Sequence, residues 1–437
     1  MHSGLRPILI VWTLLTSTLA FAEPANDAAV TGWIDGHLSE IVALYEHLHA
    51  HPELSLEEHE TAARVAQEFR DAGLAVTTSF GATGVVGVLR NGSGPVVLLR
   101  GDMDGLPLTE ETGAPYASQV VVERPDGTRT GVMHACGHDV HTANLVGTVR
   151  MLAALKDRWR GTLLAIAQPA EEIGQGARRM LAAGLFEKFP KPDVALALHV
   201  WSDMEAGHVG TTPGFWAANV DSVDITVYGR GGHGARPHAA VAPVVTAAHL
   251  VVALQTLVSR RVDPLEPAVV TVGSIHAGTK HNLIPNTAHL QLTVRSFSKP
   301  VREQLLSGIR QIAVDTCRTF QCPQPPDVEL KDEYTPAAYN DPALTRSAGE
   351  LFRTLFGEDH VIDSPPGMGG EDFGMYAPAL GIPGLLFRLG TIDPNTVNQP
   401  VPSLHSSRFL PLAEKTLRTG LRAMGNLVLS QLDAASD

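Results

Sequence analysis

Apolar residues recur with two different periods along the first half of the chain. Between Asp35 and His49 they follow a helical period, and a second helix is predicted from Leu56 to Ala72. Short Val- and Leu-rich runs then predict strands at Val85–Leu89, Val96–Leu99, Leu163–Ala167 and Val194–His199, separated by helical patterns such as Asn144–Leu155 and Ala177–Ala183. This alternation predicts an α/β layer with a largely parallel sheet.

The pattern changes between about residues 212 and 330 and then returns. The changed segment predicts strands at Val220–Tyr228, Ala268–Ile275 and Ala288–Phe297, and helices at Pro243–Ser259 and Val301–Thr319. This order indicates a compact α+β insert with an antiparallel sheet. Helical patterns at Asp341–Phe356 and Leu412–Leu432 follow it. We therefore expect a main domain of residues 23–211 and 331–437, interrupted by a smaller domain of residues 212–330.

The N-terminal residues predict a signal peptide. Arg6 precedes a mostly apolar run from Ile8 to Leu19, and Ala20-Phe21-Ala22 matches a small-x-small cleavage site before Glu23. The run is short for a membrane anchor and contains Thr and Ser. We expect residues 1–22 to be removed and the mature protein to be periplasmic or secreted. No later segment is expected to be long and apolar enough to cross a membrane.

The charge and the cysteines narrow the possible partners. With 33 Lys and Arg against 46 Asp and Glu, the net charge is -13, which argues against nucleic acid or an anionic membrane as a partner. Cys317 and Cys322 lie close together near the end of a predicted helix, and in an exported protein they are candidates for a disulfide. We assign that pair no functional role.

The densest group of chemically active side chains is His134-Ala-Cys136-Gly-His138-Asp-Val-His141. Cysteine sulfur and histidine nitrogen are common ligands of zinc and similar divalent ions. Cys136 and His138 can point to one site from an irregular loop, whereas His134 and His141 are predicted to be supporting or structural residues. The segment therefore favours a metal-dependent hydrolase.

Further candidate groups follow the predicted strands. Asp102 and Asp104 come after one strand, Glu171-Glu172 after another, and His199 ends a third. In α/β sheets, ligands gather beyond the carboxyl ends of strands. Adjacent acids are ordinary at a solvated helix start, but beside a metal Glu172 would bind the ion and Glu171 would take a proton from the attacking water.

Other polar residues have weaker individual signals. His405 lies near the C-terminus without periodic context, and in the insert His233 lies in a Gly-rich loop, with Asn282 and Arg295 further along. The loop lacks both the spacing of a dinucleotide fingerprint and the lysine of a phosphate loop. Arg295 suits a substrate carboxylate, although a surface arginine on a strand is an equal alternative from composition alone.

Taken in order, these motifs resemble the aminoacylase and carboxypeptidase metallohydrolase family. The most similar branch contains hippurate hydrolase, N-acyl-amino-acid amidohydrolases and the plant indole-acetyl-amino-acid hydrolases. The matching segments span almost the whole mature chain: His47-Leu-His-Ala-His-Pro-Glu-Leu-Ser, Asp102-Met-Asp-Gly-Leu-Pro, Met133-His-Ala-Cys-Gly-His-Asp, Pro169-Ala-Glu-Glu, Gly231-Gly-His-Gly-Ala, Asn282-Leu-Ile-Pro, Gly370-Glu-Asp-Phe and Leu404-His405.

The resemblance implies a role for each candidate. It implies two divalent ions, zinc, manganese or cobalt, bound by Cys136, His138, Glu172, His199 and His405. Glu171 matches the general base, Asp104 a residue supporting the metal site, and His233, Asn282 and Arg295 residues that reach the substrate from the smaller domain. In dimeric relatives that domain mediates pairing and its His can serve the neighbouring site, so the resemblance implies a homodimer.

The expected reaction is hydrolysis of the amide bond of N-acyl amino acids. One alternative is a dipeptidase or carboxypeptidase that uses the same site. A second alternative, from a different class, is a non-catalytic binding protein on this fold; the presence of Glu171 and of every expected ligand counts against it. The longer segment Val120–Thr130 and Ala242 before Pro243 depart from the branch's usual pattern and put the specificity, rather than the catalysis, in question.

Overall fold

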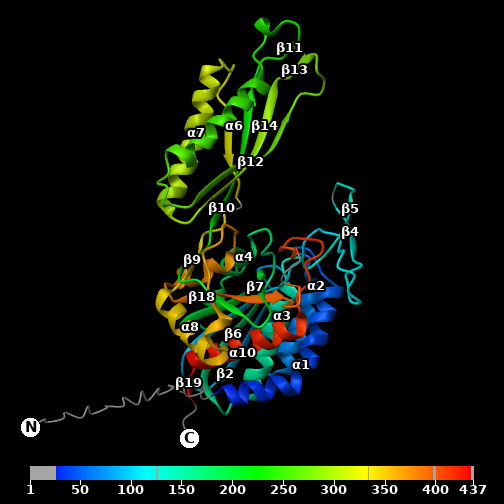
Figure 1. The fold of residues 1–437 in the computed structure, drawn as a ribbon, viewed down its shortest axis with the longest axis vertical. Coiled ribbons are helices and arrows are strands. Elements are labelled where there is room, and N and C mark those ends of the chain that lie inside the picture. Colours follow the sequence, from blue (N-terminus) through cyan, green and yellow to red (C-terminus); the bar gives the residue numbers. More distant parts are fainter. Residues whose placement is uncertain (1–25, 125, 333, 397–399, 435–437) are drawn as a thin grey trace, which may run out of the picture.

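The computed structural model describes residues 26–124, 126–332, 334–396 and 400–434. A large lobe contains both ends of the described chain, and a smaller lobe extends away from it (Figure 1). The predicted signal peptide, residues 1–22, lies outside the described residues.

A nine-stranded sheet forms the centre of the large lobe, in the order β1-β2-β6-β3-β7-β18-β8-β17, with β19 paired to β6. The strands are β1 (Ala75–Phe80), β2 (Gly84–Asn91), β3 (Val96–Asp102), β6 (Trp159–Gln168), β7 (Val194–Glu205), β8 (Val209–Thr211), β17 (Val361–Asp363), β18 (Gly384–Ile392) and β19 (Asp433–Ala434). The central strands β6, β3, β7 and β18 run parallel, while β1 and β2 add antiparallel pairs at one edge. The predicted α/β class is confirmed.

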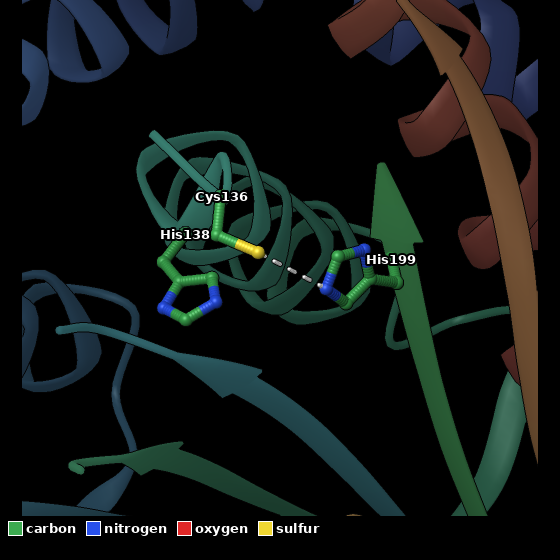
Figure 2. A group of neighbouring side chains, drawn as sticks. All are labelled: Cys136, His138 and His199. Atoms are coloured by element: carbon green, nitrogen blue, oxygen red, sulfur yellow. Dashed lines mark hydrogen bonds between the residues drawn. The ribbon is translucent and has the colours of Figure 1, made fainter. Parts of the chain in front are cut away.

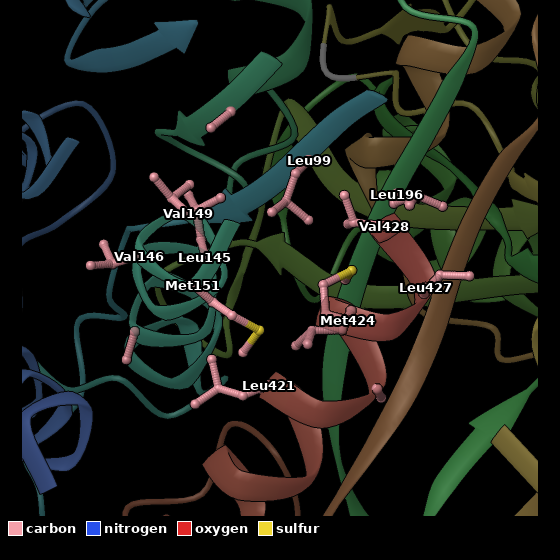
Figure 3. Close-up of a cluster of buried hydrophobic side chains, with 14 of the residues drawn as sticks. Leu99, Leu145, Val146, Val149, Met151, Leu196, Leu421, Met424, Leu427 and Val428 are labelled. Carbon is pink, nitrogen blue, oxygen red and sulfur yellow. The ribbon is translucent and has the colours of Figure 1, made fainter. Parts of the chain in front are cut away.

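Helices cover both faces of this sheet. The helices of the large lobe are α1 (Asp27–Ala50), α2 (His59–Asp71), α3 (His138–Ala154), α4 (Gly176–Ala182), α5 (Leu185–Lys188), α8 (Pro342–Phe356), α9 (Tyr376–Leu380) and α10 (Ala413–Gln431). On one face, Leu145 of α3 and Val428 of α10 pack in the same cluster as Leu99 and Leu196 of the sheet (Figure 3). The other face packs against α4, α5 and α9. Burial on both faces explains why these strands are continuous apolar runs.

The smaller lobe contains a four-stranded antiparallel sheet in the order β12-β14-β10-β15. Its elements are β10 (Asn219–Tyr228), β11 (Gly232–His233), α6 (Pro243–Arg260), β12 (Ala268–Ala277), β13 (Leu283–Ile284), β14 (Thr287–Ser296), α7 (Lys299–Thr319) and β15 (Asp327–Leu330). Alternate residues of β10, including Val223, Ile225 and Val227, are buried in a core with α6 and α7. These elements match the ones predicted for the insert, and β15 is an additional strand. The boundaries of the inserted domain, at residues 212 and 330, stay a prediction.

Short elements complete the described chain. They are β4 (Val121–Glu123), β5 (Arg129–Gly131), β9 (Gly214–Ala217), β16 (Ala338–Asn340) and the 3₁₀ turns η1 (Pro237–Ala239), η2 (Glu358–His360) and η3 (Asp372–Met375). The long segment predicted before Met133 forms the β4–β5 hairpin. Cys317 and Cys322, the candidate disulfide pair, carry free thiols.

Two expectations are corrected. The irregular loop expected around Cys136 and His138 ends earlier, because His138 is already the first residue of α3. Within the described residues, α6 has the length and apolar composition of a membrane-spanning helix. No such segment was expected from the sequence after the signal peptide. Core helices share that composition, and Leu250, Leu254 and Leu257 of α6 are buried in the small-lobe core, so the resemblance is weak evidence for a span.

Candidate functional site

One cavity of about 680 Å³ opens at the carboxyl ends of the central strands. Asp102 ends β3, Glu171 lies just beyond β6, and His199 lies on β7. Because these strands are parallel neighbours, the polar residues that follow them meet at the same edge of the sheet. The lining includes predicted site residues from both lobes, namely Cys136, Glu171, Glu172, His199, Arg295 and His405.

Cys136, His138 and His199 form the centre of this site (Figure 2). The Cys136 sulfur lies 3.7 Å from Nε2 of His199, and the candidate ligand atoms of all three residues lie within 4.8 Å of one another. Gly137 between them has a φ of +78°, and a Cβ there would lie 2.4 Å from a Val200 methyl. Glycine therefore allows the chain to turn into α3 while Cys136 and His138 face one point.

Hydrogen bonds orient the two imidazoles so that their Nε2 atoms face the site. Nδ1 of His138 lies 2.8 Å from the Asp104 carbonyl oxygen and 3.1 Å from its carboxylate, and Nδ1 of His199 lies 2.7 Å from the Val200 carbonyl oxygen. Nε2 of His138 is buried and has no hydrogen-bond partner among the described residues. This is the arrangement by which proteins hold a metal-binding histidine.

Glu171 and Glu172 bring carboxylates to the same point. Oε1 of Glu172 lies 3.9 Å from Nε2 of His138, and its other oxygen lies 3.6 Å from Nε2 of His405. Cys136, Glu172 and His405 make a second group whose ligand atoms lie within 4.8 Å of one another, so Cys136 belongs to two groups. Four of the five predicted ligands are buried or partly buried, whereas the His405 side chain is 57% exposed.

The electrostatics of the cluster fit a bound cation. Burial raises the pKa of Glu171 well above its usual range, and the neighbouring Glu371 and Glu172 carboxylates raise it further. Burial also raises the pKa of Glu172 to about 7, and burial together with Glu172 raises that of the Cys136 thiol. A divalent ion relieves these costs, because it stabilises the thiolate and the carboxylates in their charged forms. The donors present therefore suit a metal site.

Asp104 connects the two sides of the cluster. Its carboxylate accepts hydrogen bonds from the backbone N–H groups of Glu171 and Glu172, at 3.1 and 3.0 Å, and from the Ser55 hydroxyl at 2.6 Å. It also meets Nδ1 of His138. Asp104 is fully enclosed, so it fixes the positions of other groups rather than facing the cavity.

His141 has no ring nitrogen left for a metal ion. Its Nδ1 lies 2.6 Å from an Asp102 carboxylate oxygen, and its Nε2 accepts a hydrogen bond from the Val200 backbone N–H at 2.9 Å. Burial lowers the pKa of His141 to about 3, so the ring is neutral. The geometry agrees with the supporting role predicted for this residue.

Two buried groups that support the site were missed from the sequence. Arg100 donates hydrogen bonds to Asp102, Glu371 and Asp372, at distances of 2.6 to 3.1 Å. Glu58 accepts the backbone N–H of Ala170, which has a φ of +54° directly before the two glutamates. The sequence did hold a signal for a role of Arg100, because this charged residue directly follows the apolar run Val96–Leu99. Glu58 gave no such signal in the sequence, because acidic residues are common at the start of a helix.

The insert residues divide into two groups. Arg295 of β14 lines the cavity. Its Nε donates a hydrogen bond to the Thr293 hydroxyl at 2.9 Å, and among the described residues no carboxylate forms an ion pair with its guanidinium. His233 and Asn282 are exposed and do not line this cavity. His233 lies in β11 and Asn282 directly precedes β13, and both strands are at the far tip of the small lobe (Figure 1). Within one chain, therefore, the structure does not bring His233 and Asn282 to the predicted site.

Comparison with curated proteins identifies hydrolases over most of the chain. The chain is 38% identical to hippurate hydrolase of Campylobacter jejuni, covering 75% of this chain and 82% of that protein. It is 36% identical to N-acetyl-L-cysteine deacetylase of Bacillus subtilis, covering 85% of each. It is 34% identical to thermostable carboxypeptidase 2 of Saccharolobus solfataricus, covering 89% of this chain and 94% of that protein.

Solved structures agree with these relatives. An aminohydrolase from methicillin-resistant Staphylococcus aureus has a TM-score of 0.82 at 31% identity, covering 93% of this chain and all of that chain. A dinuclear metal-binding peptidase of the M20 family from Bacillus subtilis has a TM-score of 0.74 at 28% identity, covering 91% and 99%. The model of peptidase family M20/M25/M40 matches residues 98–430. The chain therefore belongs to peptidase family M20/M25/M40 and is a metallohydrolase of its amidohydrolase and peptidase group.

Proposed function

We propose that the protein hydrolyses the amide bond of N-acyl amino acids and releases a carboxylic acid and a free amino acid. One observation carries the proposal: a single cavity is lined by Glu171, by four of the five candidate metal ligands and by Arg295, whose guanidinium forms no ion pair among the described residues. The last suits the α-carboxylate of an amino acid. Relatives named for hydrolysis of acylated amino acids support the same class of substrate.

The proposed roles follow from the positions of the side chains. Cys136, His138, Glu172, His199 and His405 would hold two divalent ions, zinc, manganese or cobalt. Such ions, when bound, acidify water and polarise the scissile carbonyl. Glu171 takes a proton from the attacking water and delivers it to the nitrogen as the carbon–nitrogen bond breaks, while Arg295 holds the α-carboxylate.

His233 and Asn282 enter this account through a second subunit. They lie in β11 and directly before β13, the strands at the tip of the small lobe in Figure 1. We therefore propose that they contribute to a partner's site in a homodimer, with His233 stabilising the oxyanion. The edge strand β12 and the outer face of α6 are the proposed interface, because Ile275 is 48% exposed and Val252 is 69% exposed. We further propose that the signal peptide exports the protein to the periplasm or the medium.

A panel of substrates distinguishes acyl-amino-acid hydrolysis from peptidase activity. We expect the purified, metal-loaded protein to cleave N-acetyl, N-benzoyl and longer N-acyl amino acids faster than unblocked dipeptides, with product amine measured by ninhydrin or chromatography. The Glu171→Gln variant is expected to lose at least about 10²-fold in kcat, because it cannot accept the proton. Cleavage of free dipeptides alone would move the assignment to a peptidase. Turnover of neither class by a folded, metal-loaded protein would favour a binding protein.

A further inference from the structure

A buried guanidinium lies beside the cavity without an acidic partner. Arg388 of β18 is only 2% exposed, and among the described residues it makes one side-chain hydrogen bond, from Nη1 to the Pro365 carbonyl oxygen at 2.8 Å. Its Nε and Nη2 have no partner among the described residues, and no described carboxylate oxygen lies within 4.0 Å of the group. Leaving such donors unpaired in the interior is costly, so their retention calls for a ligand.

The position of Arg388 places it next to the predicted reaction centre. In the parallel pair of β18 and β7 it lies directly opposite His199, so both side chains leave the same face of the sheet. Its guanidinium stacks on Trp201, 4.0 Å from the ring centre, and lies 5.2 Å from that of Trp216. Both tryptophans line the cavity.

Only a thin wall separates Arg388 from the cavity. The wall includes Gly367, and a Cβ added there would lie 3.7 Å from Nη2 of Arg388 and 3.6 Å from the edge of the Trp201 ring. Because residue 367 carries no side chain, only backbone and the edge of the partly exposed Trp201 ring lie between Nη2 and the cavity at this point.

A second donor without a described partner lies in the same region. The indole Nε1 of Trp216 is buried and has no described partner, and the Trp216 ring lies 5.9 Å from the rings of both His199 and Trp201. Burial lowers the pKa of Arg388 to about 10, against the opposing charge of Asp203, which lies beyond ion-pair distance, and the guanidinium stays charged at neutral pH. An arginine and an indole N–H together offer hydrogen bonds to an anionic acceptor.

We propose that Arg388 and Trp216 form a subsite for a carboxylate at the end of the substrate's acyl chain. Arg388 lies on the strand next to His199, so a short dicarboxylic acyl chain is the class of substrate that would extend from the reaction centre toward it. The favoured class is therefore an N-succinyl or similar short dicarboxylic acyl amino acid. This inference rests on the proposed amide hydrolysis and names its acyl specificity.

Two acyl groups of equal shape test the subsite. Succinyl carries a terminal carboxylate, and isocaproyl carries two methyl groups in the same positions, so the ratio of their kcat/KM values reports recognition of the charge. We expect the unaltered protein to favour the succinyl substrate. We expect Arg388→Met to lower the ratio about 10- to 100-fold, because it removes a charged pair with the carboxylate. We expect Trp216→Phe to lower the ratio less, because it removes only one hydrogen bond.

The controls separate recognition from folding and from the proposed reaction. Arg346→Met removes an exposed arginine on α8 and should leave the ratio unchanged. If Arg388→Met does not fold, Arg388→Lys keeps the charge without the planar fork and should show an intermediate ratio. Calorimetric binding of both substrates to metal-loaded Glu171→Gln measures the preference without turnover, so failure of hydrolysis does not hide the result.

An equal preference for both acyl groups in the unaltered protein would overturn the subsite. So would an unchanged ratio in a folded Arg388→Met variant, which would make Arg388 a structural cation between two tryptophans. A loss that affects every substrate with an α-carboxylate, but not the acyl ratio, would assign Arg388 to the amino-acid end and also overturn the proposal. Absence of hydrolysis together with preserved succinyl binding would refute only the proposed function.

Discussion

Asp104 illustrates how a single residue can organise the candidate site without facing the cavity. Its carboxylate meets the backbone of both glutamates, the hydroxyl of Ser55 and the imidazole of His138. The motif Asp102-Met-Asp104 was recognisable in the sequence as a pair of acids after a strand. Which acid positions the glutamates was not, because the contact joins residues more than sixty positions apart.

We expect Asp104→Asn to weaken metal binding about 10- to 100-fold. The amide has one oxygen where the carboxylate has two, so it cannot accept all of these hydrogen bonds, and it orients His138 less firmly. Titration against a chelator measures this affinity, and kcat/KM should fall with it. Asp126→Asn, on the exposed β4–β5 hairpin, is the matched control. Unaltered metal affinity in a folded Asp104→Asn protein would contradict the positioning role.

Among the elements, β18 shows where sequence reasoning failed. Gly384–Ile392 is a central strand, yet Arg388 interrupts its apolar run, and it was not predicted. The interruption is tolerated because Trp201 and Trp216, nearly two hundred residues earlier in the chain, stack on the guanidinium. Helices α8 and α10 were predicted to within one residue at each end, whereas α1 begins at Asp27, before the predicted start at Asp35. His138 was misplaced because a left-handed glycine starts α3 directly.

Helices α1 and α10 are joined by an ion pair that makes stability depend on pH. Arg422 donates two hydrogen bonds to the buried Asp27 carboxylate, at 2.9 and 2.6 Å. Burial alone raises the pKa of Asp27, but the bonds and charge of Arg422 outweigh it and hold the pKa below 3.8. The pair therefore stabilises the folded state at pH values above the pKa that Asp27 has in the unfolded chain. This contribution is lost as the pH falls through the lower pKa that Asp27 has in the folded state.

We expect Asp27→Asn to lower the free energy of unfolding by about 1–3 kcal/mol at neutral pH. The difference from the unaltered protein should shrink below about pH 4, where the unfolded aspartate binds a proton. Urea denaturation across this pH range measures it. A difference that is the same at neutral and at acidic pH would show that the charge of Asp27 is not its source.

At the scale of the whole molecule, the two lobes supply different parts of one site. The large lobe carries the candidate ligands, and the small lobe contributes Arg295 to the same cavity. The sequence predicted the insert from its change of pattern. It did not show that His233 and Asn282 lie at the far tip, because the direction in which the small lobe extends depends on packing that no local pattern encodes.

The proposed homodimer predicts that a charge on the outer face of α6 disrupts association. We expect Val252→Glu to weaken dimerisation at least about 10-fold, because burying an unpaired carboxylate in an interface is costly. Sedimentation velocity over a range of concentrations measures the change. Ser307→Glu, on the exposed side of α7, is the control. A monomer in the unaltered protein would refute the dimer, and so would a dimer that Val252→Glu leaves intact.

The most direct test of the account is amide hydrolysis by metal-free protein before and after reloading with zinc, manganese or cobalt, with bound metal counted in the same samples. We expect no activity without metal, recovery as about two ions bind per chain, and no recovery in Glu171→Gln although it binds the same amount. Full activity in the metal-free protein, or equal activity of metal-loaded Glu171→Gln, would contradict a metallohydrolase that uses Glu171 as its base.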